Sequence, residues 1–169
     1  MNDKVTKFGN CAHNIAATVE YTLNDPSEFA PSCVEDFVCN AVGSLDLFEH
    51  DFRDSHPATF TELGSLAEAG MAGAALLLGL KGQVSKLANQ MTDLYARKNR
   101  DYGNSFDKSM DKFGLVVAAI RIGDKVNRLL SLVAKRGEAE VKDENMADTF
   151  IDLACYAIMT LMWMEGKVG

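Results

Sequence analysis

Hydrophobic side chains recur every three or four residues along most of the chain, which is the spacing of one face of an α-helix. The first such run covers residues 4–23 and ends at Pro26. A second begins at Ser32, where Glu35 three residues later completes a capping-box pattern, and it ends before Pro57. The pattern therefore predicts two amphipathic helices in the first third of the chain.

The middle of the chain continues the same periodicity. Thr59 and Glu62 form another capping-box pattern, and the helix that they open runs through an Ala/Gly/Leu-rich stretch to about Leu80. Because the small residues of this stretch permit close approach of a neighbouring helix, we expect the segment to be buried. A further helix is predicted over about residues 83–98.

Polar residues divide the C-terminal half. Residues 98–105, KNRDYGNS, are predicted to form a loop. A helix from about 114 to 135 follows, then a charged turn at 137–143, and a last helix from about 144 to 165. Prolines are few and no strand-like alternation occurs. The sequence thus predicts an all-α bundle of about five to six helices.

Length and composition add limits to this picture. The chain has 169 residues and no Pro/Gly/Ser linker, so we expect one compact domain with a sizeable core. Within it, residues 1–80 form a helical region of unknown role and residues 81–169 a helical core. The net charge of -7 argues against a protein that coats DNA or RNA. This charge does not exclude a protein that binds a small nucleotide through a bridging metal ion.

The cysteines and the apolar runs indicate in which cellular compartment the protein is expected. None of the four cysteines shows paired metal-ligand spacing, so we interpret them as reduced core residues. The first ten residues lack the apolar stretch of a signal peptide. The run from Met71 to Leu80 is too short to cross a bilayer. We therefore expect a cytoplasmic protein with no membrane partner.

The last predicted helix carries the most informative pattern. One face is apolar, and opposite it three acids follow one another at i, i+4 and i+8, namely Glu144, Asp148 and Asp152. Beyond Asp152 the same stripe becomes apolar. Because both faces of the helix are largely apolar, we expect it to lie between neighbouring helices, with its acids in a cleft or an interface.

Stacked carboxylates in a cleft repel one another, and a divalent cation relieves that repulsion. Carboxylate oxygens are ligands that Mg²⁺ or Mn²⁺ prefers. The alternative is a solvated acidic first turn, which suits a helix N-terminus. That alternative accounts for Glu144 better than for Asp152, which lies two turns into the helix. Spacing alone leaves the two interpretations about equal.

The preceding helix offers Asp124, with Arg121, Lys125 and Arg128 nearby. In a functional interpretation Asp124 is a metal ligand and the cations hold phosphate groups. The alternative is a cluster of surface ion pairs, which contributes little to stability. The spacing of these four residues by itself favours the surface cluster.

The predicted loop offers a further set of polar groups: Lys98, Asp101, Tyr102, Asn104 and Ser105. Its glycine lets the backbone approach a ligand, and Tyr102 could stack on a base. An ordinary polar connection between helices would look the same. The sequence contains no phosphate-binding glycine loop of the P-loop kind and no dinucleotide fingerprint.

Three segments resemble a known family: KNRDYGNSFDKS, AAIRIGDKVNRLLSL and VKDENMADTFIDLACYAI. Together they look like the nucleotide-modification-associated domain found in many bacterial and phage proteins. That family is in turn similar to the all-α, MazG-like nucleoside triphosphate pyrophosphohydrolases. The resemblance covers roughly the C-terminal half and implies a MazG-like helical core there.

MazG-like enzymes are usually oligomeric helical bundles that bind Mg²⁺ through acids on two helices and cleave a nucleoside triphosphate to monophosphate and pyrophosphate. The resemblance implies that Asp148 and Asp152 match the paired acids of the late helix. The earlier helix departs from the enzymes, which show two glutamates where this chain has Asp124 followed by Lys125. One ligand is therefore missing or is supplied by Asp101.

The leading hypothesis is a Mg²⁺-dependent nucleotide pyrophosphohydrolase that forms a dimer or tetramer. Its metal ligands and catalytic acids would be Asp124, Asp148 and Asp152, with Glu144 assisting. Groups that contact the nucleotide would be Lys98, Arg121, Lys125 and Arg128 at the phosphates and Tyr102 and Asn104 at the base or sugar. Two alternatives stay open: a non-catalytic nucleotide-binding module of a base-modification pathway, and a structural or interaction protein.

Overall fold

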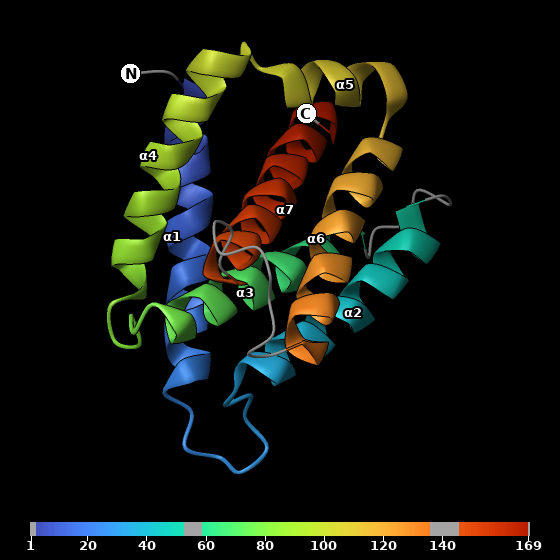
Figure 1. Ribbon diagram of the computed structural model, residues 1–169. Helices are drawn as coiled ribbons and strands as arrows, with labels where there is room; N and C mark the ends of the chain where they lie inside the picture. Colours follow the sequence, from blue (N-terminus) through green and yellow to red (C-terminus); the bar gives the residue numbers. More distant parts are fainter. Residues whose placement is uncertain (1–2, 53–58, 136–145, 169) are drawn as a thin grey trace.

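The computed structural model describes residues 3–52, 59–135 and 146–168, and these residues form an all-α bundle, as predicted (Figure 1). The described part contains seven helices rather than five or six: α1 (Asp3–Leu23), α2 (Val34–Asp51), α3 (Thr59–Leu77), α4 (Val84–Tyr102), α5 (Ser105–Phe113), α6 (Val116–Ala134) and α7 (Met146–Val168). The predicted break at His56-Pro57 and the predicted turn at 137–143 lie outside the described residues.

Helix α7 lies at the centre of the bundle and packs against α3 and α6 (Figure 1). Its fully buried side chains include Phe150, Leu153 and Ile158. Among its described side chains, only Asp148 and the last turn are exposed. The prediction of a helix buried on two faces is therefore confirmed.

The Ala/Gly-rich helix α3 approaches α7 closely, as its small residues predict. A Cβ atom at Gly70 would lie 2.7 Å from the Phe150 carbonyl oxygen and 2.8 Å from the Ala154 backbone nitrogen. A Cβ atom at Gly73 would lie 2.4 Å from the Phe150 ring. Gly70 thus lets the two backbones meet, and Gly73 makes room for the ring of Phe150.

Helix α7 also has the length and composition of a membrane span. Met146–Lys167 is the one candidate of this kind within the described residues. Half of the apolar stretch is buried inside the bundle. A core helix enclosed by α3 and α6 shows the same burial, and we interpret α7 as such a helix.

The N-terminal helices belong to the same core as the C-terminal ones. Helix α1 packs against α4, and α2 packs against α3 and α6. Phe8 of α1 stacks on Tyr95 of α4 with 4.3 Å between ring centroids. Buried residues from both halves of the chain form one hydrophobic cluster, so residues 1–80 help to hold the helices that follow them.

The start of α2 differs by one residue from the prediction. Its N-cap is Cys33, and the carboxylate of Asp36 accepts the backbone N–H groups of Ser32 (2.8 Å) and Cys33 (3.1 Å). The predicted pair of Ser32 and Glu35 is therefore wrong in register. These hydrogen bonds hold the pKa of Asp36 below its ordinary value, with the Ser32 N–H contributing most.

The predicted loop at 98–105 is largely helical. Helix α4 continues through Tyr102, and only Gly103 and Asn104 break it, both in the left-handed region with φ of 57° and 61°. Glycine reaches that region without strain and asparagine tolerates it. The short helix α5, which the sequence analysis did not predict, then lies across one end of the bundle (Figure 1).

Candidate functional site

A cavity of about 280 Å³ lies between α4, α5 and α7. Three helices supply its wall: α4 with Leu94, Tyr95, Lys98, Asn99 and Tyr102, α5 with Ser105 and Phe106, and α7 with Asp152, Cys155, Tyr156 and Met159. The tight break at Gly103 and Asn104 turns α5 across the end of α4, and this turn brings the α5 side chains to the cavity.

The charged part of the cavity is built around Asp152. Its carboxylate accepts a hydrogen bond from Nζ of Lys125 at 2.9 Å, and Nζ of Lys98 lies 3.6 Å away. Lys125 of α6 is mostly buried, whereas Lys98 is 53% exposed and lines the cavity. Two ammonium groups and one carboxylate leave a net positive charge, and the loosely held Lys98 can turn toward an anion.

The rest of the cavity is aromatic and apolar. The rings of Phe106 and Tyr156 lie 5.6 Å apart at an angle of 47°. Tyr102 stands at the rim with 68% of its surface exposed. Asn99 and Ser105 add an amide and a hydroxyl. Aromatic faces beside a few hydrogen-bonding groups suit a flat heterocycle.

The structure brings four of the candidate residues into this cavity: Lys98, Tyr102, Ser105 and Asp152. Lys125 joins them through Asp152. Arg128 lies close by on α6, where its Nε donates to Oγ1 of Thr149 at 3.2 Å. These side chains from α4, α6 and α7 therefore lie near one another in the structure.

Other predicted residues lie elsewhere. Asp101 and Arg121 are exposed and do not line the cavity, and Asn104 occupies the junction of α4 and α5. Asp124 lines a different groove between α2 and α6, next to Glu49. Helix α6 thus directs Lys125 toward α7 and Asp124 toward α2.

The predicted metal ligands are not assembled in the described residues. Asp148 is exposed in the first turn of α7, Asp124 lies in the other groove, and Glu144 is outside the described part. No group of three or more His, Cys, Asp or Glu side chains placed to hold a metal ion occurs in that part. Asp152, the remaining candidate, is already engaged by two lysines. The described side chains of one chain therefore do not bring the predicted ligands together, and Asp152 is the one of them that lines the cavity.

Several cavity residues were not predicted from the sequence: Asn99, Phe106, Cys155 and Tyr156. A signal for two of them was available. Cys155 and Tyr156 follow Asp152 at i+3 and i+4, so any helix that presents Asp152 to a cavity presents them as well. Phe106 gave no comparable signal, because its position depends on α5.

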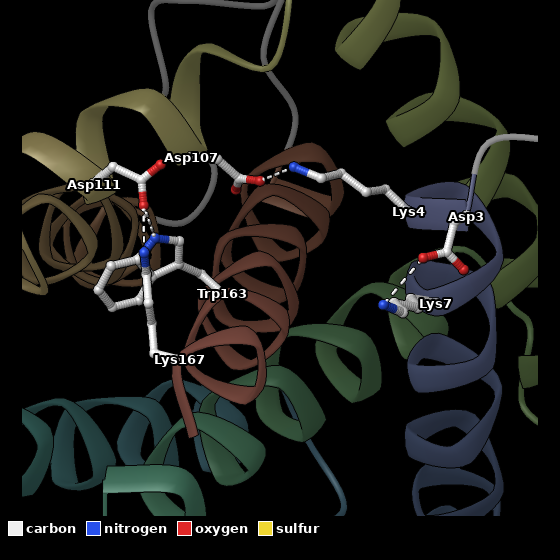
Figure 2. Close-up of polar contacts among 7 residues, drawn as sticks. All are labelled: Asp3, Lys4, Lys7, Asp107, Asp111, Trp163 and Lys167. Atoms are coloured by element: carbon white, nitrogen blue, oxygen red, sulfur yellow. Dashed lines mark hydrogen bonds and ion pairs between the residues drawn. The ribbon is translucent and has the colours of Figure 1, made fainter. Parts of the chain in front are cut away.

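Helix α5 is fastened to both ends of the described chain (Figure 2). The carboxylate of Asp111 accepts a hydrogen bond from Nε1 of Trp163 and pairs with Nζ of Lys167, both at 2.9 Å. On the other side Lys4 of α1 forms an ion pair with Asp107. The indole N–H of Trp163 thus links α7 to α5.

Removing the Asp111 carboxylate is expected to loosen α5. The hydrogen bonds from Lys167 and then Trp163 hold the pKa of Asp111 below its ordinary 3.8. Because this pKa is lowered on folding, the link is present above pH 3.8 and is lost as the pH falls through the lowered value. At neutral pH, Asp111→Asn should speed amide hydrogen exchange in residues 105–113. Global stability should change little, since the pair is exposed. Unchanged exchange would contradict this link.

The cysteine at the cavity is not an activated nucleophile. Burial, and secondarily the Asp152 charge, raises the pKa of Cys155 to about 12. Burial, and then Glu165, raises the pKa of Cys11 to about 11. A thiol with such a pKa is protonated at neutral pH and reacts slowly.

Thiol labelling checks this assignment. Cys33 and Cys39 are exposed, so the interpretation of all four cysteines as core residues is wrong for these two. With iodoacetamide at neutral pH we expect Cys33 and Cys39 to be modified first, and Cys11 and Cys155 only after denaturant is added. Peptide mass spectrometry measures the order. Rapid labelling of Cys155 in the folded protein would contradict the raised pKa of its thiol.

Comparison with known proteins adds one finding. No curated protein and no solved structure matches the chain. All of α5 and α6, and every cavity residue except Leu94 and Tyr95, lie within one segment of the sequence. That segment, residues 98–164, matches the family described as "Nucleotide modification associated domain 1".

Proposed function

We propose that this protein binds a single nucleotide in the cavity between α4, α5 and α7. The observation that carries the proposal is that Lys98 and an aromatic wall line one cavity, together with Asp152, whose carboxylate pairs with Lys125 behind it. Lys98 and Lys125 would face the phosphates, and the base would lie against Tyr102, Phe106 and Tyr156. The family match of residues 98–164 supports the ligand class by its description.

The volume of the cavity and the net charge of the chain both agree with binding of a single nucleotide. About 280 Å³ is near the lower end of the roughly 300–1,000 Å³ typical of small-molecule sites, so one mononucleotide suits it better than a dinucleotide. The chain as a whole is acidic, with a net charge of -7. An anion would therefore be attracted to the lysine end of the cavity and repelled by much of the remaining surface.

A second candidate is Mg²⁺-dependent hydrolysis of a nucleoside triphosphate to monophosphate and pyrophosphate by a cytoplasmic homo-oligomer. Asp148 and Asp152, one turn apart on α7, favour it because that spacing places two carboxylates on the same side of a helix. It needs further ligands, which Glu144 or a second copy of the chain would have to supply. The nucleotide-binding proposal needs none of these.

Calorimetry and product analysis test both candidates. The purified protein is titrated with each common deoxynucleoside mono- and triphosphate, in buffer with Mg²⁺ and in buffer with EDTA. We expect saturable binding in EDTA. Chromatography of the same mixtures then shows whether monophosphate and pyrophosphate accumulate with Mg²⁺. Absence of binding to every nucleotide in both buffers would overturn the proposed function.

An Asp152→Asn variant separates the two candidates. If Lys98 and Lys125 bind phosphate directly, removing the carboxylate between them leaves affinity in EDTA unchanged or raises it. If Asp152 is a metal ligand, the variant loses the Mg²⁺-dependent part of binding and any turnover. Asp93→Asn, an exposed change on α4 outside the cavity, is the matched control.

A further inference from the structure

A second cavity, of about 450 Å³, lies between α1, α2 and α3. All of its lining residues fall between Val19 and Ala72, outside the segment that matches the family. It therefore belongs to the part of the chain to which the sequence assigns no role. Its floor is apolar and includes the buried Phe37, Ala69 and Ala72.

One carboxylate dominates the electrostatics of this cavity. Glu68 of α3 is the one charged side chain among its lining residues. Within the described part of the chain Glu68 takes part in no ion pair, and burial raises its pKa. Because Glu68 is half-buried, its carboxylate has lost part of its hydration, and a bound cation would offset that loss.

The neighbouring groups indicate which kind of cation fits. Ser44, Ser65 and Asn40 line the same cavity as Glu68 and carry oxygen acceptors. An ammonium group has three N–H donors that such oxygens accept. Phe37, Ala69 and Ala72 offer an apolar surface for a short alkyl chain.

We infer that this cavity binds a small organic ammonium ion, with its charged group at Glu68 and its alkyl chain over Phe37. A metal ion is a poorer candidate, because the described residues contain no cluster of three ligating side chains. The inference does not depend on nucleotide binding at the other cavity, which is formed by α4, α5 and α7.

The test uses the full chain and n-butylammonium chloride as the probe. Calorimetry and thermal unfolding are compared with n-butanol, a neutral molecule of similar size, and with potassium chloride at equal ionic strength. Because a ligand that binds the folded state raises its stability, we expect a saturable rise in melting temperature with the amine alone. Equal responses to amine and salt, or no saturable response to the amine, would overturn the inference.

Two cavity variants and one control variant test whether the amine binds in this cavity. Glu68→Gln keeps the shape of the side chain and should weaken amine binding at least tenfold, whereas Glu165→Gln, an exposed change on α7, should leave it unchanged. Gly43 lines the cavity, and a Cβ atom there would meet no atom within 4 Å. Gly43→Leu should therefore fold, since leucine favours helix, and fill the cavity. Undiminished amine binding by either folded cavity variant would place the ligand elsewhere and overturn the assignment.

Discussion

Gly70→Ala is expected to lower the free energy of unfolding by about 1–3 kcal/mol, the usual cost of overfilling a packed core. The added methyl group would meet the Phe150 carbonyl oxygen at 2.7 Å and the Ala154 backbone nitrogen at 2.8 Å. Both are backbone atoms of α7, so no side-chain rotation relieves the clash. The two helices must move apart, and α7 is the central helix of the bundle.

Urea unfolding of the variant measures this cost as a lower midpoint. Gly64→Ala is the matched control, because Gly64 lies in the same helix and its Cβ atom would meet nothing within 4 Å. There the change should raise stability by roughly 0.5–1 kcal/mol, since alanine favours helix over glycine. If both variants were stabilised alike, the close approach of α3 to α7 would be wrong.

Lys98→Met is expected to weaken nucleotide binding by about 10- to 150-fold, if the proposed function holds. A hydrogen bond to a charged group contributes roughly 1.5–3 kcal/mol, and each 1.4 kcal/mol is a factor of ten in affinity. Lys98 lines the cavity and is held by Asp152 at 3.6 Å, so it is the cation best placed to turn toward a phosphate. Methionine keeps the length and the apolar character of the lysine stem.

Calorimetry at two salt concentrations measures this effect. The affinity of the unmodified protein should fall with added salt more steeply than that of the variant, because one charge contact is missing from the variant. Lys108→Met is the control, since Lys108 is exposed on α5 and does not line the cavity. Equal losses in the two variants would show that net charge, and not the position of Lys98, governs binding.

The periodicity of the sequence predicted the long helices well. It did not predict helix α5, because only a short interruption separates α5 from α4. Two left-handed residues, Gly103 and Asn104, separate α4 from α5. The polar run before them was interpreted as a loop, although lysine and arginine are good helix formers and suit the C-terminal end of a helix. Helix α5 has a single buried residue, Met110, so it left no hydrophobic stripe to find.

The candidate site was only partly predictable for a different reason. Neighbouring residues on a helix point about 100° apart, so whether Asp124 or Lys125 faces α7 depends on how α6 is rotated against both α2 and α7. Sequence spacing does not fix that rotation. Lys98 and Asp152 are likewise far apart in the chain, and the packing of α4 beside α7 brings them to one cavity.

Because Trp163 donates a hydrogen bond to Asp111 of α5, its fluorescence can report on the nucleotide cavity. Trp163 is the one tryptophan of the sequence, and its indole N–H is bonded to α5, which forms a wall of the nucleotide cavity. Its fluorescence emission therefore reports the immediate surroundings of that wall without any label. A shift in emission on adding a ligand for the α4–α5–α7 cavity, absent on adding an amine, would distinguish occupation of one cavity from occupation of the other in a single cuvette.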